Sequence, residues 1–511
     1  MKPSHLLRAA TLALTVHTMA VAAEPVDVRL TITPETAGAR IEPEVYGQFA
    51  EHLGTGIYGG LWVGPESKIP NTRGWRNDVV GALRQLQVPV VRWPGGCFAD
   101  DYDWRDGIGA PAKRPARLNK IWGGVIEPNR VGTHEFMDLV EQIGTEAYLA
   151  GNMGSMPPRA MGQWLEYMTS DSKSALAEER RRNGREKPWK VKYFGIGNES
   201  WGCGGNMRPE YQSDLHNQYE TFLHAPVVRV ASGDGQGNDH LVEVLMERSG
   251  SHMDALTLHY YTMPGDWSKH GSATGFNAQE WAKTLKSAMG IEGRIEAVSR
   301  LMDKHDPAKR VALYVDEWGT WYDAEPGSHP GFLQQQNSLR DALVAAESFN
   351  AFHRHTERVK MANIAQMVNV LQALALTDGA RMLLTPTYHA FDLYKPFRGA
   401  TPLKASLQSP SWTESGIELP AVDVSVARAA DGSVQLALVN LDPQRPARVV
   451  TNLNGTARGR ILTAAAMDAH NTFAQPNALV PAPYAAGSDA KPLALDLPPK
   501  SVVVVTVPAV H

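Results

Sequence analysis

The sequence predicts an α/β protein in which a (β/α)8 barrel is followed by a C-terminal β-sandwich of the jelly-roll kind. From about residue 44 to 388, short apolar runs alternate with longer segments whose apolar residues recur at helical spacing. Eight such strand-then-helix units over about 340 residues match a (β/α)8 barrel. After about residue 390, alternating apolar and polar residues replace the helical patterns, as in antiparallel strands. A doubly wound open sheet is the alternative for the first part, but no G-x-G-x-x-G follows the first strand, so a dinucleotide site is not supported.

The barrel prediction depends on eight short apolar runs, each followed by a helical or loop-rich segment. We expect the strands at Val45–Phe49, Val88–Trp93, Ala147–Gly151, Lys192–Ile196, Val227–Ala231, Ala255–His259, Val311–Val315 and Arg381–Thr385. Between them, Trp75–Gln87 and Thr133–Ile143 carry apolar stripes at helical spacing, and Thr133 is the expected N-cap of the second helix.

The C-terminal prediction depends on paired alternating runs. Val422–Ala427 and Val434–Leu441 are joined by Asp431-Gly432, a hairpin turn signal, and Leu493–Leu497 and Val502–Val507 add further strands. Residues 26–33 also alternate and are expected to pair with this domain. We therefore divide the chain into a signal peptide (1–23), an N-terminal strand segment (24–40), the catalytic barrel (41–388) and the C-terminal β-sandwich (389–511).

Composition restricts the class of protein and its partners. The 511 residues carry 50 basic and 54 acidic side chains, so the net charge of −4 gives no footprint for nucleic acid or an anionic membrane. Beyond the N-terminus there is no apolar run of about 18–20 residues, which excludes a multi-span membrane protein.

The first residues resemble an export signal. Lys2 and Arg8 precede the apolar stretch Ala9–Ala22, and Ala20-Val21-Ala22 has the small-x-small pattern of a cleavage site. We therefore expect a secreted protein, periplasmic or extracellular. In an oxidising compartment Cys97 and Cys203 are able to pair, but free thiols in a packed site are the expectation.

Two expected strands end in a glutamate beside a tryptophan. The fourth ends Gly197-Asn198-Glu199-Ser200-Trp201, and the seventh ends Asp316-Glu317-Trp318. A buried carboxylate is costly unless it is paired, so such residues are usually retained for function. Barrel enzymes place their chemistry at these strand ends, and a pair of carboxylates is what glycosidic bond cleavage requires.

Further segments narrow this reading. Five further segments stand in order around Asn198-Glu199 and Glu317: Gln48–Gly60, Arg92–Phe98, Tyr102–Gly107, Leu258–Tyr261 and Ala365–Leu371. Together they resemble the α-L-arabinofuranosidases of glycoside hydrolase family 51, in the retaining clan A. The resemblance covers nearly the whole mature chain. It implies a retaining, exo-acting enzyme that removes terminal α-L-arabinofuranosyl residues from arabinoxylan, arabinan or arabino-oligosaccharides.

The resemblance also implies residue roles. Glu199 is the expected acid and base and Glu317 the nucleophile. We expect the other substrate-binding or supporting residues to be Glu51, Arg92, Cys97, Trp122, Asn198, His259, Tyr261, Trp321 and Gln366. Cys97 stands where the family pattern often has asparagine, and a thiol is a weaker donor than an amide, so one sugar contact is expected to differ.

Other readings remain open at this point. The same machinery serves an endoglucanase or a β-xylosidase, and an inherited barrel that only binds sugar is a third possibility. The 17 histidines show no H-E-x-x-H pattern, so no metal or other cofactor is expected. The expected partner is an arabinose-containing glycan, with no nucleic acid and no membrane, and family members often form homo-oligomers.

Overall fold

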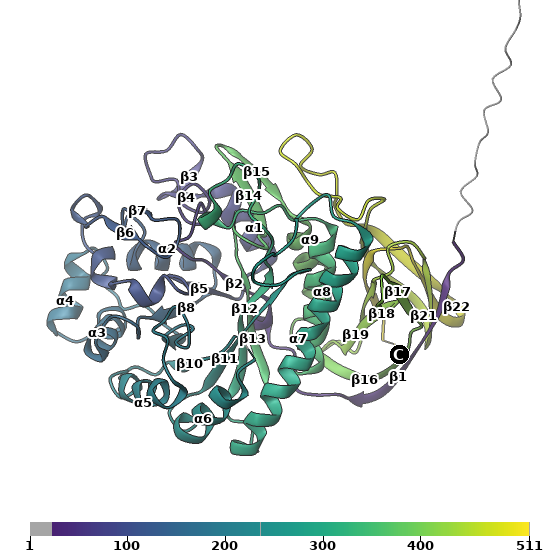
Figure 1. The fold of residues 1–511 in the computed structure, drawn as a ribbon, viewed down its shortest axis with the longest axis horizontal. Helices are drawn as coiled ribbons and strands as arrows, with labels where there is room; N and C mark the ends of the chain where they lie inside the picture. The colour runs from purple at the N-terminus through teal and green to yellow at the C-terminus, as the bar shows by residue number, and fades with distance from the viewer. Residues whose placement is uncertain (1–22, 236, 510–511) are drawn as a thin grey trace, which may run out of the picture.

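The computed structural model describes residues 23–235 and 237–509, without the side chains of residues 488–491. Apart from residue 23, the expected signal peptide lies outside the described residues. Two parts lie side by side: a barrel ringed by helices, and a β-rich domain that carries the C-terminus (Figure 1). The fold class predicted from the sequence is confirmed.

Eight parallel strands close the barrel, each hydrogen-bonded to its two neighbours. They are β2 (Gly47–Phe49), β5 (Val90–Trp93), β8 (Glu146–Gly151), β9 (Tyr193–Ile196), β10 (Val228–Asp234), β11 (Ala255–Thr262), β12 (Ala312–Thr320) and β13 (Val359–Ala365). The helices are α1 (Asn77–Leu86), α2 (Thr133–Ile143), α3 (Pro158–Thr169), α4 (Ala175–Arg182), α5 (Pro209–Glu220), α6 (Asp239–Ser249), α7 (Ala278–His305), α8 (Leu339–Arg354) and α9 (Pro386–Leu393). Among the described residues, none of these helices is long and apolar enough to cross a membrane.

The eighth strand was wrongly placed from the sequence. Arg381–Leu384 forms β15, which pairs with β14 (Ala375–Asp378) in a separate hairpin. The eighth barrel strand is β13, whose Lys360 and Asn363 hide its apolar character in the sequence. Asn363 is tolerated inside the barrel because its amide donates to the Gln48 carbonyl at 3.0 Å. At α2 the N-cap is Gly132 rather than Thr133, and Glu135 accepts from the Gly132 amide.

One end of the barrel is filled. Side chains near the starts of seven strands pack together inside it: Val90, Tyr148, Tyr193, Val230, Ala255, Tyr314 and Met361. This plug leaves the opposite end, where the strands terminate, as the place for a ligand.

The C-terminal domain is one seven-stranded sheet that folds back on itself. Its order is β1 (Val26–Thr36), β16 (Thr401–Gln408), β19 (Val422–Arg428), β20 (Val434–Asn440), β23 (Ser501–Val507), β21 (Ala447–Thr463) and β22 (Ala482–Leu497). The first half of β21 pairs with β1 and its second half with β23, which brings the two ends of the order together. β17 (Ser411–Glu414) and β18 (Ile417–Pro420) form a hairpin that packs on α7.

Helix α8 joins the two parts of the molecule. Every residue from Leu339 to His353 is buried, because the helix packs on α7, α9 and β12 on one side and on β19, β20 and β23 on the other. The first described strand, β1, pairs with β16, so the described part of the chain begins and ends in the same domain (Figure 1).

Candidate active site

A cavity of about 210 Å³ opens at the end of the barrel where the strands terminate. Nine of the eleven predicted site residues line it: Glu51, Cys97, Trp122, Glu199, His259, Tyr261, Glu317, Trp321 and Gln366. The other two, Arg92 and Asn198, are buried; Arg92 donates to Glu317 in the cavity wall and to Asn198 Oδ1. The structure thus brings together residues that are up to 315 positions apart in the sequence, such as Glu51 and Gln366.

Glu317 is held from three sides inside β12. Arg92 Nη1 donates to its Oε1 at 2.7 Å, and the Tyr261 hydroxyl donates to its Oε2 at 2.8 Å. His259 Nδ1 lies 3.5 Å from the same Oε2. Hydrogen bonds to the charged form of a carboxylate favour that form, so this arrangement suits an ionised Glu317.

Glu199 follows β9 and is held differently. Its φ of 40° lies in the left-handed region, which a residue other than glycine adopts at a cost of order 1–3 kcal/mol. One carboxylate oxygen, Oε1, lies 2.8 Å from His259 Nδ1. Oxygens of Glu199 and Glu317 and the imidazole nitrogen between them all lie within 4.8 Å of one another.

A buried charge network supports both glutamates. Asp316 lies beneath them, where its Oδ2 accepts from the Tyr148 hydroxyl at 2.8 Å and lies 3.3 Å from Arg92 Nε. Its other oxygen, Oδ1, lies 3.2 Å from His259 Nε2. Burial opposes the charged form of each group, yet their mutual attraction outweighs it. The pKa of His259 is raised well above its usual value, and the pKa of Asp316 is lowered. The network therefore favours the protonated form of His259.

Glu51 is fixed by the loop that follows β5. Its Oε1 accepts from the amides of Gly96 and Phe98 at 3.0 and 3.1 Å, and its Oε2 accepts from Gln366 Nε2 at 3.0 Å. Burial, helped by the charge of Glu317, raises the pKa of Glu51 to about 7. Arg92 pairs with Asp316 and Glu317 rather than with Glu51.

The paired glycines after β5 are required by close approach. A Cβ on Gly95 would lie 2.8 Å from the Glu51 side chain, and a Cβ on Gly96 would lie 2.6 Å from Glu317 Oε1. Any side chain at either position would therefore displace one of these carboxylates.

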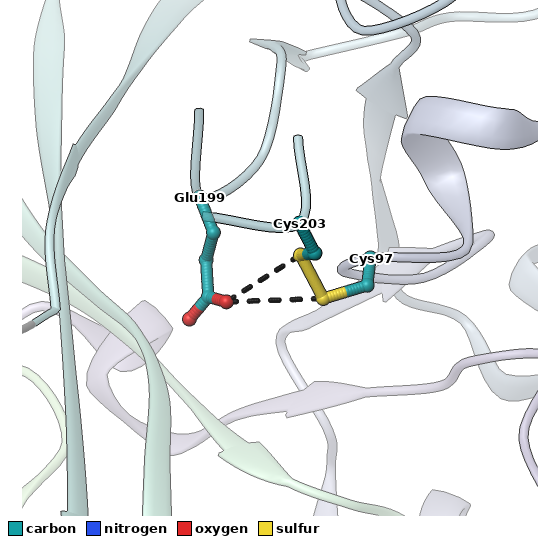
Figure 2. A group of neighbouring side chains, drawn as sticks. All are labelled: Cys97, Glu199 and Cys203. Carbon is teal, nitrogen blue, oxygen red and sulfur yellow. Dashed lines mark hydrogen bonds between the residues drawn. A yellow bond between two sulfur atoms is a disulfide. The ribbon is translucent and has the colours of Figure 1, made fainter. Parts of the chain in front are cut away.

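The expectation of free thiols at Cys97 and Cys203 was wrong. The two residues form a disulfide, with Cα atoms 5.6 Å apart despite a sequence separation of 106 residues. They pair because the loops after β5 and β9 both extend over the barrel mouth, which sequence distance does not reveal. The Glu199 carboxylate faces the two sulfurs (Figure 2). A disulfide sulfur has no hydrogen to donate, so Cys97 cannot replace an asparagine as a donor to a sugar.

Aromatic side chains form the wall and rim. Tyr261 and Trp321 meet edge to face at 4.9 Å between ring centroids, and Trp267 extends this cluster outward, 5.4 Å from Trp321 and 61% exposed. Trp267, Trp201 and Asp316 were not singled out from the sequence. Asp316 immediately precedes Glu317 at the same strand end, and that position was the available signal.

Three groups of side chains among the described residues lie close enough to share a metal ion, and each has another explanation. In Cys97, Glu199 and Cys203 the sulfurs are bonded to each other. Glu199, His259 and Glu317 form the charge network described above. In the third group, Glu292, Glu296 and His355, both oxygens of Glu292 accept from Arg354.

Family models agree with the site. One described as the α-L-arabinofuranosidase 1 domain matches residues 82–276, and one described as the α-L-arabinofuranosidase C-terminal domain matches residues 316–501. Together they cover the strands that carry both glutamates and most of the C-terminal sheet.

Relatives match over nearly the whole length. An intracellular exo-α-L-arabinofuranosidase of Bacteroides ovatus is 46% identical over 93% of this chain and 94% of its own. The α-L-arabinofuranosidase C of Emericella nidulans is 30% identical over 81% and 85%. Among solved structures, the GH51 arabinofuranosidase of Xanthomonas axonopodis pv. citri superimposes with a TM-score of 0.93 at 53% identity, covering 94% of this chain and 99% of that one. An arabinose complex of the Thermotoga maritima α-L-arabinofuranosidase has a TM-score of 0.83 at 26% identity, covering 94% and 99%.

The barrel and its cavity, taken with these matches, define a glycoside hydrolase. Two family models and a relative at 46% identity show to which family of glycoside hydrolases the chain belongs. The chain belongs to glycoside hydrolase family 51, the α-L-arabinofuranosidases.

The comparison with relatives contradicts the export that the first residues of the sequence predicted. The relative from Bacteroides ovatus, which matches 93% of the chain, is named an intracellular enzyme, which points away from a secreted, periplasmic or extracellular protein.

Proposed function

We propose that this protein is an exo-acting, retaining α-L-arabinofuranosidase that uses Glu317 as nucleophile and Glu199 as acid and base. The observation that carries the proposal is the pair of glutamates at the barrel mouth, whose oxygens approach within 4.8 Å. Retaining glycosidases hold their two carboxyl groups at about 5–5.5 Å, whereas inverting enzymes need about 6.5–9.5 Å to admit a water molecule.

In the first step, Glu317 attacks the anomeric carbon while Glu199 gives its proton to the departing oxygen. The surrounding charges support these roles. Arg92 pairs with Asp316 and Glu317, and His259 lies 2.8 Å from Glu199 and 3.2 Å from Asp316, so both glutamates stand in one network of charged groups. Arg92 and Tyr261 also aim Glu317, because each donates to a different one of its oxygens.

In the second step, Glu199 takes a proton from water, which attacks the sugar ester and releases arabinose with retained configuration. The ester has removed the negative charge of Glu317. Loss of a neighbouring negative charge removes a repulsion, which suits a carboxylate that must act as a base in this step. The same side chain therefore serves as acid and then as base.

The cavity supports a single terminal sugar as the bound unit. It is small, and it is closed on one side by the Trp321 and Tyr261 rings. Glu51 and Gln366 hold each other at 3.0 Å and face this cavity, where an acceptor and an amide suit sugar hydroxyls. The relatives named as α-L-arabinofuranosidases and the arabinose complex of a neighbour support arabinose as that sugar. Arabinoxylan, arabinan and arabino-oligosaccharides are the proposed sources.

Hydrolysis of aryl glycosides tests the proposal. The purified protein is given 4-nitrophenyl α-L-arabinofuranoside, β-xyloside and β-glucoside, with Glu317→Ala as the control for contaminating activity. We expect release from the arabinofuranoside alone, with arabinose formed first as the α anomer. Faster release from the xyloside or glucoside would favour the alternative substrates, and arabinose formed first as the β anomer would overturn the retaining mechanism.

A further inference from the structure

We propose that the Cys97–Cys203 disulfide is a positioning element that keeps one oxygen of Glu199 free of hydrogen-bond donors, and that a thiol reductant switches off this effect. The proposal deepens the proposed function, since it takes Glu199 as the acid and base.

The two oxygens of Glu199 have different neighbours. Oε1 lies 2.8 Å from His259 Nδ1, and the raised pKa of His259 favours the imidazolium form, which donates at this nitrogen. Oε2 lies 3.6 Å from Cys203 Sγ and 3.8 Å from Cys97 Sγ, on the side that Figure 2 shows facing the disulfide. A general acid must hold its proton on an oxygen that does not already accept one. Within the described part of the chain, Oε2 is that oxygen.

Reduction of the disulfide would bring hydrogen-bond donors to Oε2. The S–S bond breaks, and its two sulfurs take two electrons and two protons from a dithiol such as dithiothreitol, which becomes a cyclic disulfide. A covalent bond holds two sulfurs closer than unbonded atoms can approach, so the new thiols must separate within the space around Oε2. Each thiol is also a weak donor, and donors to a carboxylate favour its ionised form.

Other contacts hold the loop that carries Glu199. Trp201 Nε1 donates to the Gly233 carbonyl at 2.9 Å, and the Asn198 amide donates to Asp100 Oδ2 at 2.8 Å. The amide of Gly202 donates to the Glu199 carbonyl at 2.7 Å. The loop therefore keeps its anchors without the disulfide, and the main effect of reduction is on the proton of Glu199.

The disulfide is also accessible. Cys203 is exposed, and Cys97 lines the cavity. The chain has two cysteines, so every thiol that appears on reduction reports this one bond.

The experiment compares the full-length protein before and after dithiothreitol, with thiols counted by a colorimetric reagent. Values of kcat/KM are measured from pH 4 to 9 on an arabino-oligosaccharide and on 4-nitrophenyl α-L-arabinofuranoside. For the oligosaccharide, kcat/KM should fall at high pH. We expect this alkaline limb of the pH profile to move to lower pH on reduction. The loss should be about tenfold at neutral pH and small at pH 5. The nitrophenyl substrate, which needs little protonation, should change less than threefold, and reoxidation should restore the original profile.

Two matched double variants separate the proton effect from loss of the tether. Cys97→Ser with Cys203→Ser replaces the disulfide by two hydroxyl donors and should reproduce the reduced profile. Cys97→Ala with Cys203→Ala has no donors and should keep its alkaline limb within half a pH unit of the oxidised protein. Neither variant should respond to dithiothreitol. Identical profiles for the oxidised and reduced proteins, or for the alanine and serine pairs, would overturn the proposal. Failure of Glu199 as the acid is detected separately, by substituting Glu199 itself.

Discussion

The two glutamates at the barrel mouth differ in the kind of neighbour each one has. Glu317 lies within β12, its side chain is 8% exposed, and it accepts hydrogen bonds from Arg92 and Tyr261. Glu199 lies on a loop after β9, its side chain is 19% exposed, and half of its carboxylate faces sulfur. A nucleophile must stay ionised and aimed, whereas an acid that becomes a base must exchange a proton. The number of donors around each carboxylate follows this difference.

Substitution of Glu317, the proposed nucleophile, should have the largest effect. Glu317→Gln keeps the side-chain shape but cannot form the sugar ester, so kcat/KM should fall by about 10⁴-fold or more on every substrate. Steady-state kinetics on aryl and natural substrates check this, and circular dichroism confirms that the variant is folded. Residual activity above 1% would mean that another group performs the attack.

Substitution of Glu199, the proposed acid, should affect the two kinds of substrate differently. Glu199→Ala should lower kcat/KM by about 10²–10⁴-fold on arabino-oligosaccharides, whose leaving oxygen needs a proton. A nitrophenyl leaving group needs little protonation, so the first step with that substrate should lose much less. Equal losses on the two substrates would contradict the assignment of Glu199 as the acid.

A conservative change at Arg92 tests how the side chain of Glu317 is oriented. Arg92 contacts Glu317 and Asn198 with different nitrogens, at 2.7 and 2.6 Å, and lysine keeps the charge but loses this fork. We expect Arg92→Lys to lower kcat about 10²-fold and to change KM little, because the contact orients a reacting group. A change confined to KM would show that Arg92 acts in substrate binding.

A third carboxylate shows that the number of donors alone does not determine ionisation. Glu51 accepts three hydrogen bonds, yet burial raises its pKa to about 7, against about 4.3 in an unfolded chain. Its stabilising contribution is therefore fully present below about pH 4.3 and is lost as the pH rises through about 7. The free energy of unfolding of the wild type, minus that of Glu51→Gln, should fall by up to about 3 kcal/mol between pH 5 and 8.

Urea unfolding at the two pH values measures this difference. Burial also raises the pKa of Asp100 to about 7, but Asp100 is present in both proteins and cancels. A difference that stays constant or rises with pH would show that Glu51 is ionised throughout.

Local sequence patterns predicted the barrel and the two glutamates because apolar strands that end in Asn198-Glu199 and Asp316-Glu317 are short, local signals. The disulfide was not predictable, because Cys97 and Cys203 are brought together only when the barrel closes. The eighth strand was misplaced because Asn363 has a partner inside the barrel that the sequence does not show, whereas the more apolar Arg381–Leu384 pairs with β14. Asp316 was overlooked because its partners, Arg92, Tyr148 and His259, come from three other strands.

Strand β1 affects the order in which the protein is able to form as it is synthesised. Arg29 pairs with Gln408, so the first strand emerges from the ribosome 379 residues before its partner. At about 5–20 residues per second this interval is roughly 20–75 s. During that time the row of Val26, Val28, Leu30 and Ile32, all buried in the finished sheet, has nothing to cover it. A strand left unpaired in this way is prone to aggregate. We therefore expect the yield of folded protein to depend on chaperones that shield β1 during translation.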